Sequence, residues 1–264
     1  NKTALVTGGG GLLALQHANA ILKKKGNLIL VDIDKGKLTR NIKVLKSHFK
    51  RNIYFFVCDI TKEKKVLALK KKLKKLNLIP DILINNAAVN HSPGKNNIKK
   101  LRLETFDIIN FVKELDVGLV GAVICTKIFG YEMSKRKYGI ILNIGSDLSF
   151  ISPDQNLYQK KIIKSKYQEV KPVSYSIIKH GIVGLTKYTA TYWANKNVRC
   201  NLLAPGGIYN NQPKEFLNKI KKIIPLKRMA KKNEYEEAIL FLISDASSYM
   251  NGASLIIDGG RTAL

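Results

Sequence analysis

Short apolar segments rich in β-branched residues alternate with longer segments of helical periodicity along the whole chain. The predicted strands cover residues 3–7, 27–32, 53–57, 81–84, 139–144, 198–203 and 254–257. The predicted helices include residues 12–25, 62–76, 115–135, 174–194 and 233–242. Some strands, such as the Leu-Ile-Leu-Val run at 28–31, are apolar at consecutive positions, which is typical of a parallel sheet buried on both faces. The pattern predicts an α/β fold, a doubly wound parallel sheet of about seven strands in a single domain over residues 1–264.

The formal charge of +27 first suggests a polyanionic partner such as nucleic acid or an anionic membrane. However, only seven of the 46 basic residues are Arg, and Lys, Ile and Asn, which A/T-rich codons specify, are all abundant. The Lys residues lie on polar helix faces, as at 70–72, without the interleaved aromatic residues that would stack on bases. We therefore expect a solvated surface and no nucleic-acid partner, although the charge would favour an anionic small-molecule substrate.

Other function classes are disfavoured by the hydrophobic runs and the cysteines. No apolar run approaches the ~20 residues that cross a bilayer, and the first apolar stretch leads into a glycine-rich turn rather than a signal peptide. Cys58, Cys125 and Cys200 are far apart and odd in number, so we expect neither a disulfide framework nor a metal site. These features predict no membrane association and a cytoplasmic location.

A glycine-rich turn, Thr7-Gly-Gly-Gly-Gly-Leu-Leu-Ala14, follows the first predicted strand. Gly9, Gly11 and Ala14 satisfy G-x-G-x-x-G/A, and Gly8 with Gly11 fits the related T-G-x-x-G pattern. Without Cβ atoms, such a turn brings backbone N–H groups and a helix N-terminus close to a pyrophosphate. The alternative is a plain turn, but the order strand, turn, helix, strand favours a Rossmann-type site for a dinucleotide.

Asp32 ends the second predicted strand, where a carboxylate can accept hydrogen bonds from ribose hydroxyls and repel a 2′-phosphate. This position predicts NAD as the cofactor, with NADP less favoured. The alternative is an Asp that serves only the following turn, and the nearby Lys35 and Lys37 leave room for NADP. Asp59 and the small and amide residues at 85–88 follow the third and fourth strands, where a cofactor would lie.

Tyr175 and Lys179 are four residues apart in a predicted helix and therefore share a face. A neighbouring ammonium favours the phenolate and should bring the Tyr175 pKa toward a useful acid–base range. Ser146 closes the fifth predicted strand and could hold a substrate oxygen by hydrogen bond. A surface Tyr–Lys pair is the alternative, but together with the glycine-rich turn the three residues predict proton and hydride transfer at a carbonyl.

Over nearly its whole length the chain resembles the short-chain dehydrogenase/reductase family in its single-domain branch. The residues that carry the resemblance are Thr7, Gly8, Gly11, Asp32, Asp59, Ile60, the 85–87 segment, Ser146, Tyr175, Lys179, Asn201, the 204–208 segment, Gly252, Ala253 and the 258–260 segment.

The resemblance implies roles for individual residues. Ser146, Tyr175 and Lys179 would be catalytic, and Lys179 would also bind the nicotinamide ribose. The implied cofactor contacts are Gly8, Gly11, Leu12 and Leu13 at the pyrophosphate, Asp32 at the ribose, Asp59, Ile60 and Asn86 along the adenosine, and Ile208 at the carboxamide. The resemblance also implies a homotetramer or homodimer, with an interface formed by the helices near 115–135 and 174–194.

The chain departs from the family pattern at two places. Gly118 occupies a position where many members carry an Asn that supports a proton-relay water. Ser146 and Tyr175 are 29 residues apart, a wider spacing than is usual in the family. We expect the inserted residues, near 150–172, to form a substrate-binding lid, the alternative being a plain surface loop.

The sequence thus predicts an NAD-dependent oxidoreductase that interconverts a secondary alcohol and a ketone. Similarity to oxidoreductases of bacterial surface-polysaccharide and flagellin-glycosylation clusters points to a sugar or sugar-nucleotide substrate. His91 is a candidate substrate contact, whereas His17 is interpreted as a packing residue rather than a second acid–base group. Two alternatives remain: a sugar-nucleotide epimerase or dehydratase that retains its NAD, and a non-catalytic polyanion-binding protein.

Overall fold

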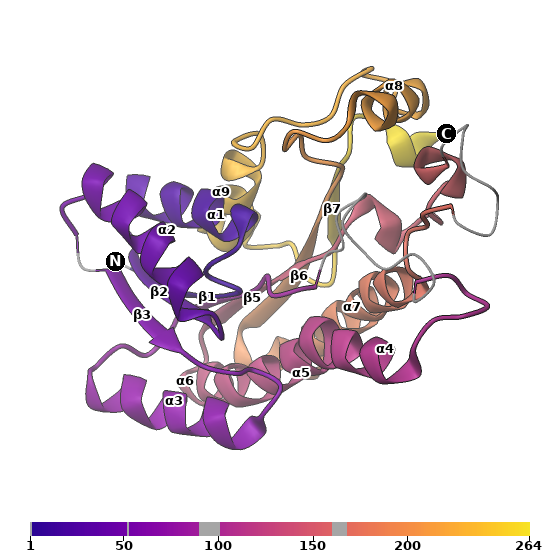
Figure 1. Cartoon of the computed structure of the whole chain (residues 1–264). Coiled ribbons are helices and arrows are strands. Elements are labelled where there is room, and N and C mark those ends of the chain that lie inside the picture. Colours follow the sequence, from indigo (N-terminus) through magenta and orange to yellow (C-terminus); the bar gives the residue numbers. More distant parts are fainter. Residues whose placement is uncertain (1, 52, 90–100, 160–167) are drawn as a thin grey trace.

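The computed structural model describes residues 2–51, 53–89, 101–159 and 168–264. Its sheet has seven parallel strands in the order β3-β2-β1-β4-β5-β6-β7 (Figure 1). The strands are β1 (Thr3–Thr7), β2 (Asn27–Asp32), β3 (Ile53–Val57), β4 (Ile82–Asn85), β5 (Gly139–Ile144), β6 (Val198–Pro205) and β7 (Ser254–Ile257). The predicted single-domain, doubly wound α/β fold is confirmed, and the strand bounds differ from the sequence-based ones only at β4 and β6.

Helices cover both faces of the sheet, as Figure 1 shows. The helices are α1 (Leu12–Lys23), α2 (Lys35–His48), α3 (Glu63–Lys75), α4 (Ile108–Leu115), α5 (Gly121–Cys125), α6 (Tyr131–Arg136), α7 (Val173–Tyr192), α8 (Lys214–Ile223) and α9 (Glu236–Ile243). The predicted helix at 115–135 is longer than expected, because α4, α5 and α6 are joined by π-helical turns into one helical stretch over residues 108–136.

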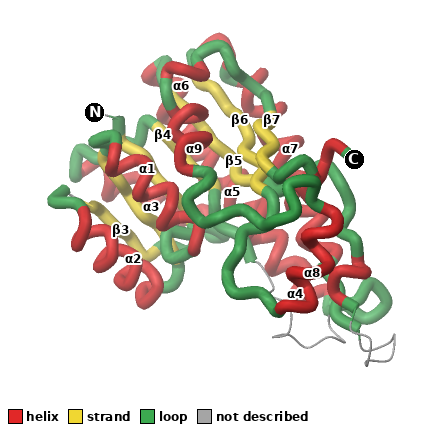
Figure 2. The backbone as a smooth tube through the Cα atoms, turned by 90° about the horizontal axis from the view of Figure 1, so that it is seen from above, coloured by secondary structure: helices red, strands yellow, loops and turns green. Residues whose placement is uncertain are grey.

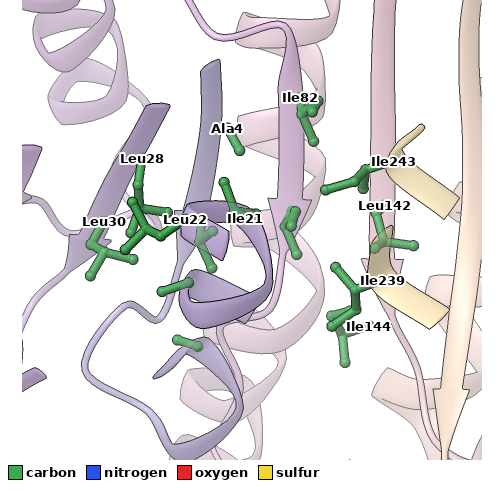
Figure 3. Close-up of a cluster of buried hydrophobic side chains, with 14 of the residues drawn as sticks. Ala4, Ile21, Leu22, Leu28, Leu30, Ile82, Leu142, Ile144, Ile239 and Ile243 are labelled. Carbon is green, nitrogen blue, oxygen red and sulfur yellow. The ribbon is translucent and has the colours of Figure 1, made fainter. Parts of the chain in front are cut away.

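Alternate side chains of each strand enter different core clusters, as the period of two requires. In β1, Ala4 and Val6 pack with α1, α2 and α9, whereas Leu5 packs on the opposite face with α3 and α6. Figure 3 shows the first cluster, in which Ile21 of α1 and Ile239 of α9 meet the strands. This burial on both faces explains the continuously apolar strands.

The strand order reverses between β1 and β4, which are neighbours although β2 and β3 separate them in sequence. In open α/β sheets, ligands bind beyond the carboxyl ends of the strands at such a switch point. The glycine-rich turn follows β1, and Asn86 follows β4, so both lie at this crevice. Helices α4 and α8 lie at the other side of the molecule from α2 and β3 (Figures 1 and 2).

The described residues lack two features, a membrane-spanning helix and a cluster of metal ligands. None of their helices has both the length and the apolar character to cross a bilayer. No group of three or more His, Cys, Asp or Glu side chains is placed there to hold a metal ion.

Candidate active site

The glycine-rich turn passes too close to the segment after β4 to carry side chains. Gly8 has φ +65, and a Cβ there would lie 2.8 Å from the Cα of Ala87. Gly11 donates its N–H to the Gly8 carbonyl at 2.9 Å and begins α1 without a side-chain cap. The N–H groups of Leu12 and Leu13 open α1 at this point, so the turn has the form of a pyrophosphate cradle.

The buried side-chain amide of Asn41 in α2 donates hydrogen bonds to the backbone of this turn. Asn41 donates through Nδ2 to the Gly9 carbonyl at 2.9 Å and the Gly11 carbonyl at 3.2 Å. This residue was missed from the sequence, because its contact spans about thirty residues and no motif marks it. A polar residue on the buried face of α2, between Leu38 and Leu45, was the available signal.

Asp32 lies beside the same turn. Its Oδ2 accepts from the Gly10 N–H at 2.9 Å, and its Oδ1 accepts from the Asp34 N–H at 2.9 Å. A carboxylate has about four acceptor positions, so these contacts leave capacity for ribose hydroxyls. Lys37 pairs with Asp34 at 3.2 Å, which directs its ammonium toward that carboxylate.

Asn86 is fixed at the end of β4 by three contacts with β1 and α1. Its Nδ2 donates to the Thr7 carbonyl at 3.0 Å, its N–H donates to the Thr7 hydroxyl at 3.0 Å, and its Oδ1 faces His17 Nε2 at 3.2 Å. Burial lowers the pKa of His17 to about 4, so the imidazole is neutral at physiological pH. His17 thus packs in the core of α1 and positions Asn86, whereas His91 lies outside the described residues.

The other sequence-predicted cofactor residues lie at the same edge of the sheet. Asp59 follows β3 and accepts at Oδ1 from the Thr61 N–H at 3.0 Å and hydroxyl at 2.7 Å. Ile60 is buried in the same apolar cluster as α3. Ile208 follows β6, bridges to Ala230 and packs against the cluster of α1 and α9.

Ser146 follows β5 and belongs to a buried polar network. Its hydroxyl donates to Asp147 Oδ1 at 2.7 Å and accepts from the Leu148 N–H at 3.2 Å. The other oxygen of Asp147 accepts from Arg261 Nη1 at 2.7 Å, and these two charged side chains are only 4% and 9% exposed. The sequence analysis missed both Asp147 and Arg261, because residues 114 positions apart form the ion pair.

Tyr175 and Lys179 face this network from α7. Lys179 donates through Nζ to the Ile144 carbonyl at 2.8 Å, which joins α7 to the end of β5, and its Nζ lies 5.7 Å from the centre of the Tyr175 ring. Burial lowers the pKa of Lys179 to about 8, with a smaller contribution from the ammonium of Lys171.

The electrostatics of Tyr175 differ from the sequence-based expectation. Burial raises the pKa of Tyr175 to about 12, a hydrogen bond with Ser146 lowers it, and the carboxylate of Asp147 raises it. The prediction that a neighbouring ammonium brings the pKa of Tyr175 toward a useful range therefore underestimated desolvation, which penalises the charged phenolate.

Gly118 lies in the π-helical turn between α4 and α5, against α7. A Cβ at this position would lie 2.7 Å from Cγ2 of Ile178. Ile178 thus fills the space that an Asn side chain would need, and no relay group can be added at residue 118 unless Ile178 moves.

The first described part of the inserted segment, residues 150–159, packs against α8. Tyr158 contacts Phe216 with ring centres 5.7 Å apart, and Lys219 donates to the carbonyls of Asn156 and Gln159. A pocket of about 380 Å³ adjoins the N-terminus of α7, and its lining includes Val89, Phe106, Phe111, Glu114, Pro172 and Ser174. Two of its lining residues, Pro172 and Ser174, lie close to Tyr175 in sequence.

A glycine-rich turn at the switch point and a cluster of Ser146, Tyr175 and Lys179 beyond β5 fit an oxidoreductase of the Rossmann class. A family model described as enoyl-(acyl carrier protein) reductase matches residues 12–262. The chain belongs to the short-chain dehydrogenase/reductase family.

Individual relatives match over almost the full length. A 2-dehydro-3-deoxy-D-gluconate 5-dehydrogenase from Bacillus subtilis is 32% identical, with 98% of this chain and 94% of that protein covered. Post-translational flagellin modification protein A from Campylobacter coli is 29% identical, with 98% of each covered. A solved short chain dehydrogenase from Leptospira borgpetersenii with bound NAD+ has a TM-score of 0.80 and 28% identity, covering 99% of this chain and 93% of that one.

Proposed function

We propose that this protein is an NAD-dependent oxidoreductase that interconverts a secondary alcohol and a ketone on a carbohydrate-derived substrate. The observation that carries the proposal is the buried cluster beyond β5, in which Lys179 binds the Ile144 carbonyl and Tyr175 shares a hydrogen bond with Ser146. The cradle formed by Gly8, Gly11 and the start of α1 lies at the same edge of the sheet.

Each residue of the cluster has a distinct task in alcohol oxidation. Tyr175, as phenolate, removes the hydroxyl proton, and Ser146 holds the reacting oxygen by hydrogen bond. Lys179 stabilises the phenolate and binds ribose hydroxyls. Bound NAD+ supplies the hydride acceptor. In the direction of ketone reduction, Tyr175 returns the proton.

The names of two relatives support a sugar-derived substrate. One is a dehydrogenase of a deoxygluconate, which is a sugar acid, and the other modifies flagellin. The surplus of basic residues favours an anionic compound, because a positive surround attracts such ligands. We therefore propose an anionic sugar derivative, such as a sugar acid or a sugar nucleotide.

The decisive experiment is a screen of polyols, sugar acids and sugar nucleotides for NAD+ reduction at 340 nm. We expect net NADH formation with at least one anionic sugar derivative. An epimerase or dehydratase that retains its cofactor would form product without net NADH. Failure of every substrate, together with salt-sensitive RNA binding and no NADH binding, would instead support the polyanion-binding alternative.

Asp32→Asn tests the proposed choice of NAD over NADP. The amide retains an oxygen for the Gly10 N–H but loses the charge that repels a 2′-phosphate. Charged hydrogen bonds contribute about 1.5–3 kcal/mol, so we expect the Kd for NADH to rise at least about tenfold. The Kd for NADPH should fall or stay constant. Fluorescence titration with both cofactors measures the ratio, and an unchanged ratio would remove Asp32 from this role.

We also propose a cytoplasmic homotetramer. Exposed apolar side chains lie along the helices that the family resemblance assigns to an interface: Val120, Val123, Tyr131, Ile177, Tyr188 and Tyr192. Ile108, Ile109 and Val112 extend this set along α4. Apolar side chains in such number are typical of a surface that another subunit covers. Sedimentation equilibrium tests the assembly, and a 29.6 kDa species at micromolar concentration would contradict it.

A further inference from the structure

A second lysine, Lys171, lies against the ring of Tyr175. Its Nζ is 3.7 Å from the ring centre, whereas the Nζ of Lys179 is 5.7 Å from the same point. The two lysines precede and follow Tyr175 by four residues, but only Lys179 lies on the same helix as Tyr175. Lys171 belongs instead to the inserted segment.

The backbone of Lys171 is held in a fixed place. The side-chain amide of Gln155 accepts from the Lys171 N–H at 2.9 Å and donates to the Lys171 carbonyl at 3.1 Å. Pro172 follows directly and caps α7, and a residue before proline is restricted to extended conformations. These hydrogen bonds join the two described parts of the insertion, residues 150–159 and 168–172, at Lys171, whose side chain contacts Tyr175.

The side chain of Lys171 is partly buried. Burial lowers its pKa to about 8, while the carboxylates of Asp147 and Glu114 act in the opposite direction. At neutral pH the side chain therefore remains mostly cationic, so an ammonium lies against the ring of Tyr175.

Other charged and polar groups face Tyr175 or its neighbours Lys171 and Asp147. Those on the elements around it are Ser146 and Asp147 at the end of β5, Tyr158 and Lys171 of the inserted segment, Glu114 of α4, Lys179 of α7 and Arg261 near the C-terminus. Asp147 is already paired with Arg261 and bonded to Ser146. Among the described groups, Lys171 has the ammonium recorded nearest to the Tyr175 ring.

We propose that Lys171 is a positioning residue for Tyr175. The insertion supplies Lys171 as a second cation, beside Lys179, that stabilises the Tyr175 phenolate. This inference rests on the proposed acid–base role of Tyr175. A cation over a phenol ring is attracted by the π face, and the attraction increases when the ring becomes a phenolate. The insertion therefore completes the active site as well as bordering it.

The test compares Lys171→Met with Lys171→Arg. The titration of Tyr175 is followed by tyrosinate absorbance at 295 nm. For the wild type and for each Lys171 variant, the curve of the same protein carrying Tyr175→Phe is subtracted, which leaves the contribution of Tyr175. An opposite charge within about 4–6 Å changes a pKa by about one unit or more, so Lys171→Met should raise the Tyr175 pKa by at least about one unit. Lys171→Arg should restore most of the wild-type value.

The same shift should appear in catalysis. Because the phenolate is the base in alcohol oxidation, kcat/KM rises with pH. In Lys171→Met the midpoint of this rise should lie at least about one unit higher in pH. At neutral pH kcat/KM should fall about tenfold or more, mainly in kcat. Gln155→Leu, which removes the backbone clamp but keeps the lysine, should move the profile in the same direction.

Lys214→Met is the matched control, because it removes an equal charge from an exposed position on α8. It should leave the Tyr175 titration unchanged. If Lys171→Met changes only KM, or leaves the Tyr175 pKa in place, the proposal is overturned. The absorbance titration needs no substrate, so a shift in an inactive protein would refute the proposed function and still support the effect of Lys171 on Tyr175.

Discussion

Replacing Tyr175 by Phe is expected to reduce kcat for alcohol oxidation by a factor of about 10²–10⁴, the usual contribution of a positioned acid–base group. In the proposed mechanism the phenol exchanges the substrate proton, and its hydroxyl shares a hydrogen bond with Ser146. NADH should still bind with nearly the wild-type Kd, because the cradle after β1 and Asp32 is untouched. Initial rates of NAD+ reduction and fluorescence titration with NADH measure the two quantities.

The Phe variant keeps the ring against which Lys171 and Lys179 lie, so the fold should be preserved. Tyr249→Phe is the matched control, because Tyr249 is a fully exposed tyrosine outside the proposed interface and this variant should retain full activity. Substantial turnover by Tyr175→Phe would refute the proposed acid–base role. Loss of NADH binding in this variant would mean that Tyr175 also holds the cofactor.

The largest effect on stability is expected from Arg261→Met. Removal of the guanidinium leaves the carboxylate of Asp147 buried without its charged partner, and breaking a buried pair typically costs 3–5 kcal/mol. Asp258 accepts from the Gly260 and Thr262 N–H groups and so fixes the turn that presents Arg261. We expect a free energy of unfolding lower by about 3–5 kcal/mol in urea titrations. The activity should also fall, because Asp147 orients the Ser146 hydroxyl.

A double variant separates the two effects. Arg261→Met combined with Asp147→Leu removes both buried charges, and should recover part of the stability but not the activity, because the Ser146 hydroxyl loses its acceptor. Arg228→Met, which breaks an exposed pair with Glu234, is the control and should have little effect. If Arg261→Met were as stable as the wild type, the ion pair would contribute nothing to the fold.

Much of the fold follows from local sequence. Five of the seven strands have the predicted bounds, because short apolar runs rich in β-branched residues and bounded by turn residues are recognisable without knowledge of their neighbours. The glycine-rich turn and the position of Asp32 were predictable for the same reason, since each requirement is met within a few consecutive residues. Residues 108–114 were not predicted as helix, since α4 has exposed apolar side chains and no buried ones.

The sequence by itself determined the α/β fold and the glycine-rich turn after β1. It also identified Ser146, Tyr175 and Lys179 as candidate site residues. Only the tertiary structure decided what surrounds them, because these contacts join segments far apart in the chain. It hydrogen-bonds Asn41 to the turn, pairs Arg261 with Asp147 and places the ammonium of Lys171 over the Tyr175 ring. It also determined that burial raises the pKa of Tyr175, because desolvation depends on the packing of the whole domain and not on the residues next to it in sequence.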